Sequence, residues 1–99
     1  MITGPLCRAA RALTELSREK LAALSGVDEH VIELFERRIA APDANVVAML
    51  KSTLEDMGAV FIPEDRRGAG VRLKFTASET KRIATLESEG GLIRGDDVP

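Results

Sequence analysis

The sequence predicts a mainly α-helical domain of four to five helices, with a β-hairpin after the fourth helix. Three observations support this fold class. Apolar residues recur at helical spacing up to residue 57, they alternate with polar ones after residue 70, and a capping residue precedes each helical run. The chain of 99 residues has three Phe and neither Trp nor Tyr, so aliphatic side chains must form its single core.

The first helix is expected to begin after Thr3, because a threonine cap with proline close behind it is a common helix start. Its apolar face is expected to consist of Leu6, Ala9, Ala10, Leu13 and Leu16. The second helix is expected to begin at Ser17 and to carry Leu21, Ala22 and Leu24 on its inner side. It should stop at Gly26, since glycine tolerates the left-handed conformation that such a stop needs.

Asp28 is expected to cap a third helix, with Val31, Ile32 and Phe35 on its apolar side. A fourth helix should follow Asp43, and its apolar residues at helical spacing are Val46, Val47, Leu50, Leu54 and Met57. The runs AVFIP and VRLKF then flank a glycine-bearing loop, which is typical of an antiparallel hairpin with one buried face. Capping-box spacing at Thr76–Glu79 predicts a fifth helix over residues 76–88.

Composition excludes several functional classes. The single cysteine, Cys7, cannot form an internal disulfide and is expected to be a small core residue. The only histidine, His30, has no companions for a metal site. No apolar run approaches the roughly 20 residues that span a membrane, so a cytoplasmic protein is expected. Because no catalytic set or phosphate-binding loop is evident, we expect neither an enzyme nor a cofactor or small-molecule ligand.

The stretch RAARALTELSREKLAALSGVDEHVIELFERR resembles the helix-turn-helix of phage-repressor and Cro-like regulators, also called the xenobiotic-response-element family. The resemblance continues through LKSTLEDMGAVFIPEDRRGAGVRLKF and covers about residues 3–75. It implies a repressor-like DNA-binding domain at residues 1–58 and a possible dimerisation extension at 59–90. The residues GGLIRGDDVP indicate a flexible tail at 91–99. A protein of this kind would associate with the nucleoid when it is bound to DNA.

The resemblance implies that the helix at 28–38 enters the major groove while the second helix abuts the DNA backbone. The residues that it places against DNA are Arg18, Asp28, Glu29, His30, Glu33, Leu34, Arg37 and Arg38, and Arg8 also stands where phosphates would run. Arg11 and Glu36 match the family's ion pair between the first and third helices, which we expect to fix orientation more than to add stability. Arg38 stands where relatives more often have glycine, so it is expected to make the turn harder.

The acidic residues of the DNA-reading helix leave three interpretations open. Glu29 or Glu33 accepts a hydrogen bond from a cytosine amino group, with Leu34 near a thymine methyl. Alternatively, Asp28 and Glu29 only complement the positive end of the helix. In the third interpretation the surface binds a protein. We favour capping for Asp28 and base reading for Glu29 and Glu33.

We therefore expect a sequence-specific regulator of transcription, and a repressor by analogy with the family. One helix-turn-helix covers too little DNA for strong selectivity, so we expect a homodimer on a near-palindromic site of double-stranded DNA. The candidate dimerisation residues are Val60, Ile62, Val71 and Leu73, with core packing as the alternative role. Two rival functions remain: an antitoxin or protein-binding adaptor, and a helical structural module without a role in nucleic-acid binding.

Overall fold

The structure is a computed structural model, and it describes residues 1–74 of the chain. Four helices precede an antiparallel hairpin: α1 (Gly4–Thr14), α2 (Arg18–Ser25), α3 (Glu29–Glu36), α4 (Ala44–Asp56), β1 (Ala59–Ile62) and β2 (Gly70–Leu73). The predicted fold class, four helices followed by a hairpin, is confirmed. The fifth helix predicted at residues 76–88 and the tail at 91–99 lie outside the described residues.

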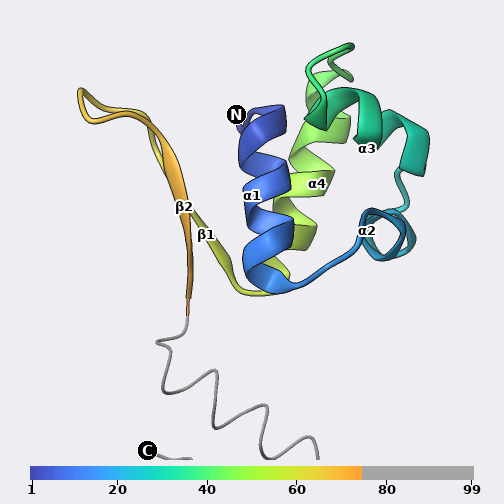
Figure 1. The fold of residues 1–99 in the computed structure, drawn as a ribbon, viewed down its shortest axis with the longest axis horizontal. Coiled ribbons are helices and arrows are strands. Elements are labelled where there is room, and N and C mark those ends of the chain that lie inside the picture. The colour runs from blue at the N-terminus through green and yellow to red at the C-terminus, as the bar shows by residue number, and fades with distance from the viewer. Residues whose placement is uncertain (75–99) are drawn as a thin grey trace, which may run out of the picture.

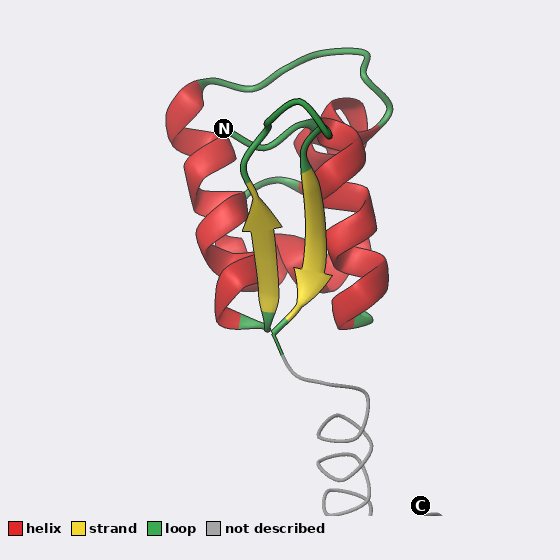
Figure 2. Cartoon of the chain, turned by 90° about the vertical axis from the view of Figure 1, so that its left-hand side faces the viewer, coloured by secondary structure: helices red, strands yellow, loops and turns green. Residues whose placement is uncertain are grey.

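Helices α1 and α4 stand side by side in the middle of the molecule (Figure 1). The hairpin covers one side of this pair, with β2 against α1 and β1 against α4 (Figure 2). Helices α2 and α3 lie on the opposite side, away from the hairpin. None of the helices within residues 1–74 is long and apolar enough to cross a membrane.

Each helix begins at the capping residue that the sequence indicates. The side chains of Thr3, Ser17, Asp28 and Asp43 accept hydrogen bonds from the backbone amides of Leu6, Lys20, His30 and Val46, respectively. These bonds satisfy amides of the first turn that have no partner within the helix. Gly26 ends α2 with a positive φ of 79°, in the conformation expected for a glycine stop.

At two other turns a residue other than glycine adopts the left-handed backbone conformation. Glu15 closes α1 with φ 60°, which the sequence analysis did not indicate. Arg38 follows α3 with φ 62°, as expected for an arginine in the place of glycine. A side chain in this conformation costs roughly 1–2 kcal/mol, so both turns are strained relative to a glycine turn.

The core draws on all four helices, and its largest fully buried side chains are Leu21, Ile32, Leu50, Leu54 and Cys7. The prediction that Cys7 is a core residue is confirmed, since its exposed fraction is 0%. Phe61 and Val71 of the hairpin pack against this core, and Ala59 belongs to it. The hairpin therefore completes the helical core.

Three residues predicted to face inward are exposed instead: Leu13 by 39%, Leu24 by 47% and Met57 by 44%. In α1 the fully buried residues are Gly4, Cys7 and Ala10, so Ala10 is the member of the predicted row that is fully buried within this helix. The eight-residue helix α2 turns only Leu21 and Ser25 fully inward, one helical turn apart. Met57 lies one position beyond the last helical residue of α4, so it leaves the helical register.

The register of the hairpin separates the four candidate dimerisation residues into two groups. Ala59 is opposite Leu73 and Phe61 is opposite Val71, and directly opposed residues share a face of a sheet. Val71 and Leu73 therefore lie on the inner face, which packs against the helices, while Val60 and Ile62 lie on the outer face. The four residues do not form one surface.

Candidate nucleic-acid interface

Helices α2 and α3 form a helix-turn-helix around a three-residue turn. Gly26 provides the left-handed turn, Val27 enters the core, and Asp28 caps α3. The inner side of α3 consists of Ile32, Phe35 and Glu36, all buried. Because these three residues hold α3 against the other helices, its opposite side faces solvent.

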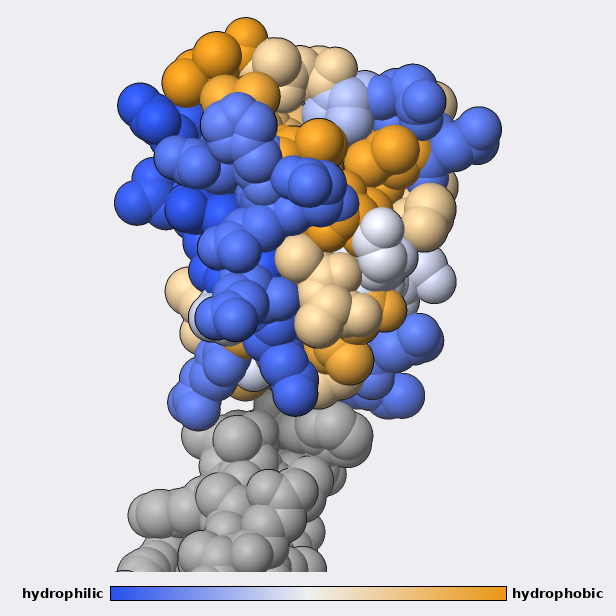
Figure 3. Space-filling model, turned by 90° about the vertical axis from the view of Figure 1, so that its right-hand side faces the viewer, coloured by the Kyte–Doolittle hydropathy of each residue, from blue (hydrophilic) through white to orange (hydrophobic). Residues whose placement is uncertain are grey.

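The outer side of α3 and the turns before and after it carry seven of the eight predicted DNA-binding residues. Asp28, Glu29, His30, Arg37 and Arg38 are exposed, whereas Glu33 and Leu34 are half-buried. Figure 3 shows the molecule from the side of α2 and α3, where a broad area of polar side chains lies beside a smaller apolar strip. This combination of exposed polar groups and a partly exposed leucine on one helix can contact both base edges and thymine methyl groups.

Glu33 is the centre of a short polar row along α3. Its carboxylate lies 3.2 Å from a terminal nitrogen of Arg37 and 3.7 Å from Nδ1 of His30. The Arg37 contact is an i,i+4 pair on a helix surface, which is worth about 0.2–0.5 kcal/mol. A competing ligand can therefore separate Glu33 from Arg37 at little cost.

Glu36 is a buried carboxylate that joins three helices. Arg11 of α1 donates two hydrogen bonds of 2.7 Å to it, one to each carboxylate oxygen. Arg18 of α2 donates from Nε at 3.3 Å, and the thiol of Cys7 donates at 3.4 Å. A further hydrogen bond of 3.1 Å links Arg11 to the backbone oxygen of Leu16. The pair inferred between Arg11 and Glu36 is thus present, and it lies within a larger network.

The network changes the acidity of its members. Burial by itself would raise the pKa of Glu36, but the hydrogen bonds and charge of Arg11 outweigh it and lower the pKa. The hydrogen bond to Glu36 raises the pKa of Arg11. Burial, together with the nearby Glu36 charge, raises the pKa of the Cys7 thiol to about 12. Glu36 is therefore ionised and Cys7 protonated at neutral pH.

Arg18 contacts Glu36 and is also partly exposed to solvent, which the sequence did not reveal. Its Nε is engaged by Glu36, yet its side chain remains 31% exposed. Its two terminal nitrogens have no protein partner among the described residues. Arg18 can thus brace α2 against α3 and still present two donors to a phosphate at the start of α2.

Three exposed arginines lie near the C-terminal end of α3. Arg8 of α1 lines the same groove, of about 550 Å³, as Arg37 and Arg38. Among the described residues, Arg8 and Arg38 form no ion pair, whereas Arg37 has only its surface contact with Glu33. We call Arg8, Arg37 and Arg38 the arginine cluster.

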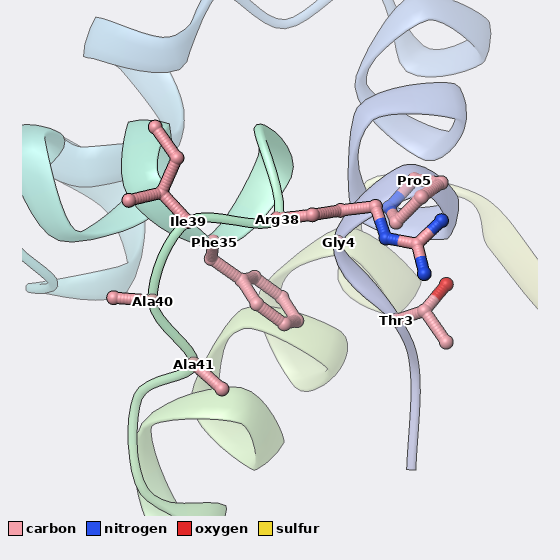
Figure 4. A pocket seen from close by; sticks show the side chains of 8 residues that line it. All are labelled: Thr3, Gly4, Pro5, Phe35, Arg38, Ile39, Ala40 and Ala41. Atoms are coloured by element: carbon pink, nitrogen blue, oxygen red, sulfur yellow. The ribbon is translucent and has the colours of Figure 1, made fainter.

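Arg38 also lines a neighbouring pocket of about 400 Å³ between the start of α1 and the segment that leads to α4. Figure 4 shows its side chain crossing this pocket from the end of α3 towards Pro5 and Thr3. The left-handed turn at Arg38 thus directs its guanidinium to α1, on the side where Arg8 lies.

Sequence reasoning missed two features of this region. Helical spacing placed Arg18 and Cys7 on separate helices, and nothing in that spacing shows that both contact Glu36. It also missed Gly4, where a Cβ atom would overlap the backbone oxygen of Phe35. This close approach brings the start of α1 against the end of α3, which helps to explain why Arg8 and Arg38 line the same groove.

Comparison with models of known protein families gives no match, and no curated protein is detectably similar to the sequence.

Proposed function

We propose that this chain is a sequence-specific DNA-binding regulator of transcription that acts as a repressor and as a homodimer. The observation that carries the proposal is the position of α3. Glu36 and its arginines fix the buried side of this helix, so that Glu29, Glu33 and Arg37 form a solvent-facing row. Arginines lie near the C-terminal end of this row, with Arg18 against Glu36 and the arginine cluster at the turn beyond α3.

The arginines supply affinity for phosphates, and the carboxylates supply selectivity. Arg8, Arg18 and Arg38 contact the backbone, which contributes binding that does not depend on base sequence. Glu29 and Glu33 accept hydrogen bonds from cytosine amino groups and repel the acceptor-rich edge of guanine. Leu34 contacts a thymine methyl group, and Asp28 remains a cap.

Binding of this kind requires Arg37 to exchange Glu33 for a phosphate. The exposed pair contributes only about 0.2–0.5 kcal/mol, whereas a hydrogen bond between charged groups contributes about 1.5–3 kcal/mol. The protein therefore loses little when the pair separates, and the separation frees the Glu33 carboxylate for a base. The acidic row is compatible with DNA binding for this reason.

A mobility-shift titration against genomic fragments at two salt concentrations tests the proposal. Wild-type protein should give discrete shifts with some fragments, and the shifts should weaken as salt rises. Arg8→Ala should weaken binding to every sequence and lower the salt slope by about 0.9, the value for one phosphate contact. Glu33→Ala should instead reduce the preference for the specific fragments.

Matched controls lie on the opposite side of the molecule, in the hairpin. Arg72→Ala removes an exposed arginine and Glu64→Ala an exposed glutamate, and neither should alter DNA binding. Arg8→Ala is a cleaner test of phosphate binding than Arg18→Ala, because Arg18 also holds Glu36. Absence of any discrete shift with folded wild-type protein would reject the DNA-binding function and favour the adaptor.

A further inference from the structure

The pocket between the start of α1 and the segment after α3 is a candidate ligand site. Its volume of about 400 Å³ lies within the range of small-molecule sites, roughly 300–1,000 Å³. Apolar residues form most of its wall: Pro5, Phe35, Ile39, Ala40 and Ala41. Two segments that are distant in the sequence form this wall, so no local pattern marks the pocket.

The backbone on one side of the pocket is held in place without a ligand. The amides of Ile39 and Ala40 donate to the oxygen of Leu34 at 2.9 and 3.3 Å. The amide of Arg38 donates to the oxygen of Phe35 at 3.1 Å. A ligand therefore meets a preformed wall, which reduces the entropy that its binding costs.

A cation lines this pocket without an anion. The guanidinium of Arg38 forms no hydrogen bond or ion pair within residues 1–74, and no carboxylate of this part of the chain lines the pocket. The hydroxyl of Thr3 accepts from the amide of Leu6 at 3.2 Å, and its own hydrogen has no acceptor among the described residues. A guanidinium binds a carboxylate through two parallel hydrogen bonds, and the Thr3 hydroxyl can donate a third.

The backbone conformation of Arg38 is a second observation that points to a ligand. Its φ of 62° is strained, and a glycine at this position would avoid the strain. Within the described residues, no ion pair of the side chain offsets this cost. Strained residues occur preferentially at ligand sites and switches, where their position serves a function. The strained turn at Arg38 places its side chain across the pocket (Figure 4).

We propose that this pocket binds a small aromatic monocarboxylate, and that the bound carboxylate withdraws Arg38 from DNA. Figure 4 shows that the ring of Phe35 and the side chain of Arg38 both extend towards the start of α1. The carboxylate pairs with the Arg38 guanidinium, and the aromatic ring lies against Pro5 and Phe35. One guanidinium matches a single negative charge, whereas the three arginines of the arginine cluster match the phosphates of a DNA backbone.

Arg38 connects this pocket with the proposed DNA-binding surface, because it lines both the pocket and the groove of the arginine cluster. A carboxylate paired with Arg38 neutralises its charge, so a phosphate beside Arg8 loses one of its cations. Loss of one hydrogen bond between charged groups corresponds to a decrease in DNA affinity of about tenfold. This regulation rests on the proposed function, whereas the binding of the ligand does not.

Ligand binding is tested first without DNA, on the isotope-labelled full-length chain with benzoate as the probe. In two-dimensional NMR spectra, millimolar benzoate should give saturable shifts of the amides of Gly4, Ile39 and Ala41, which line the pocket. Benzamide has the same ring without the charge, and acetate has the charge without the ring. Each should bind at least about tenfold more weakly than benzoate.

Matched variants separate the pocket from the arginine cluster. Arg38→Gln removes the cation of the pocket and should lose the benzoate shifts. Arg8→Gln removes an arginine that lines only the neighbouring groove and should retain them. Ala41→Leu enlarges an exposed side chain of the wall, so it should also lose the shifts while retaining its helical circular dichroism.

The effect on DNA is tested by titrating a fragment that wild-type protein shifts, with acetate replacing benzoate in the reference to keep the ionic strength equal. Saturating benzoate should weaken DNA binding about tenfold and lower the salt slope by about 0.9, the value for one phosphate contact. Arg38→Gln should bind DNA more weakly than wild type, and benzoate should not weaken it further.

The outcomes distinguish the pocket from its role in regulation. Absence of saturable shifts in folded wild-type protein, equal shifts with benzamide, or shifts that persist in Arg38→Gln would overturn the ligand site. Benzoate binding that leaves DNA affinity unchanged would overturn the regulation alone. Benzoate binding by a folded protein that shifts no DNA fragment would reject the proposed function and leave the ligand site standing.

Discussion

Removing the charge of Glu36 should destabilise the protein strongly while leaving its shape intact. We expect Glu36→Gln to have this effect, because glutamine matches glutamate in size but leaves Arg11 and Arg18 facing an uncharged amide. Breaking a buried ion pair from one side costs about 3–5 kcal/mol. Arg11 and Arg18 remain 15% and 31% exposed, so water relieves part of this penalty. We therefore expect a loss at the lower end, about 3 kcal/mol.

Urea denaturation followed by circular dichroism at pH 7 measures this loss. The urea concentration at the midpoint of unfolding should fall while the m-value stays the same. In a thermal melt, the melting temperature should drop by roughly 12–24 °C. The matched control is Glu33→Gln, whose exposed pair with Arg37 should contribute no more than about 0.5 kcal/mol. If the two variants lose the same small amount of stability, Glu36 does not hold the three helices together and the reasoning is refuted.

The lowered pKa of Glu36 gives the same substitution a dependence on pH. A carboxyl group whose pKa is depressed in the folded state adds stability above its unfolded pKa, about 4.3. That contribution is lost as the pH falls through the folded pKa. The stability difference between wild type and Glu36→Gln should therefore be constant near neutrality and narrow below about pH 4. A difference that does not change with pH would contradict the ionised state of Glu36.

Three further substitutions and one chemical modification have definite expected results. Arg38→Gly should stabilise the protein by about 0.5–1 kcal/mol, because glycine adopts the left-handed turn without strain, and it should also weaken DNA binding. Glu15→Gly should stabilise the protein in the same way without weakening DNA binding. Thermal melts and mobility shifts of both variants distinguish strain from charge, and equal losses of DNA affinity would contradict the role of Arg38. Gly4→Ala should cost at least about 1–3 kcal/mol in urea denaturation, because its Cβ would overlap the backbone oxygen of Phe35, and a neutral effect would refute that contact. The buried Cys7 thiol, with its pKa of about 12, should resist iodoacetamide at pH 8 until urea unfolds the protein, and rapid labelling of the native state would show that it is accessible.

The fold was largely predictable because local signals and tertiary packing agree. Each of the four helices starts at the capping residue that the sequence indicated, and the change from helical spacing to alternation marks the hairpin. The errors came from short elements. In an eight-residue helix such as α2, the apolar pattern cannot decide whether Leu24 or Ser25 faces inward, and packing selected Ser25. The alternation in β2 did not show that the apolar residues of β1 fall on both faces, since that depends on the register.

The candidate site was predictable as a set of exposed residues but not as an arrangement. The resemblance implied that Glu29, Glu33 and Arg37 stand against DNA, and that Arg11 is a partner of Glu36. It did not show that Arg18 joins the same carboxylate, because that contact depends on how α2 crosses α3. The position of Arg8 beside the end of α3 likewise depends on the close approach of Gly4 to Phe35, a tertiary contact without a local signal in the sequence.

The arrangement around Glu36 limits the stability that an exchange of Arg11 and Glu36 can restore. An arginine at position 36 would stand beside Arg18 as well as beside a glutamate at position 11. The exchange should therefore restore only part of the stability lost in either single reversal. Replacement of Arg18 by Gln in the exchanged background should recover more of it, because the like-charge contact is then removed.

Selection of binding sites from a library of random DNA duplexes tests the central claim most directly. Full-length wild-type protein should enrich a two-fold symmetric site whose half-sites are about one helical turn apart, 34–36 Å between centres. Glu33→Ala should enrich a degenerate version of that site, with the loss confined to particular positions in each half-site. Failure of the folded wild-type protein to enrich any sequence over the starting library would contradict sequence-specific DNA recognition through α3.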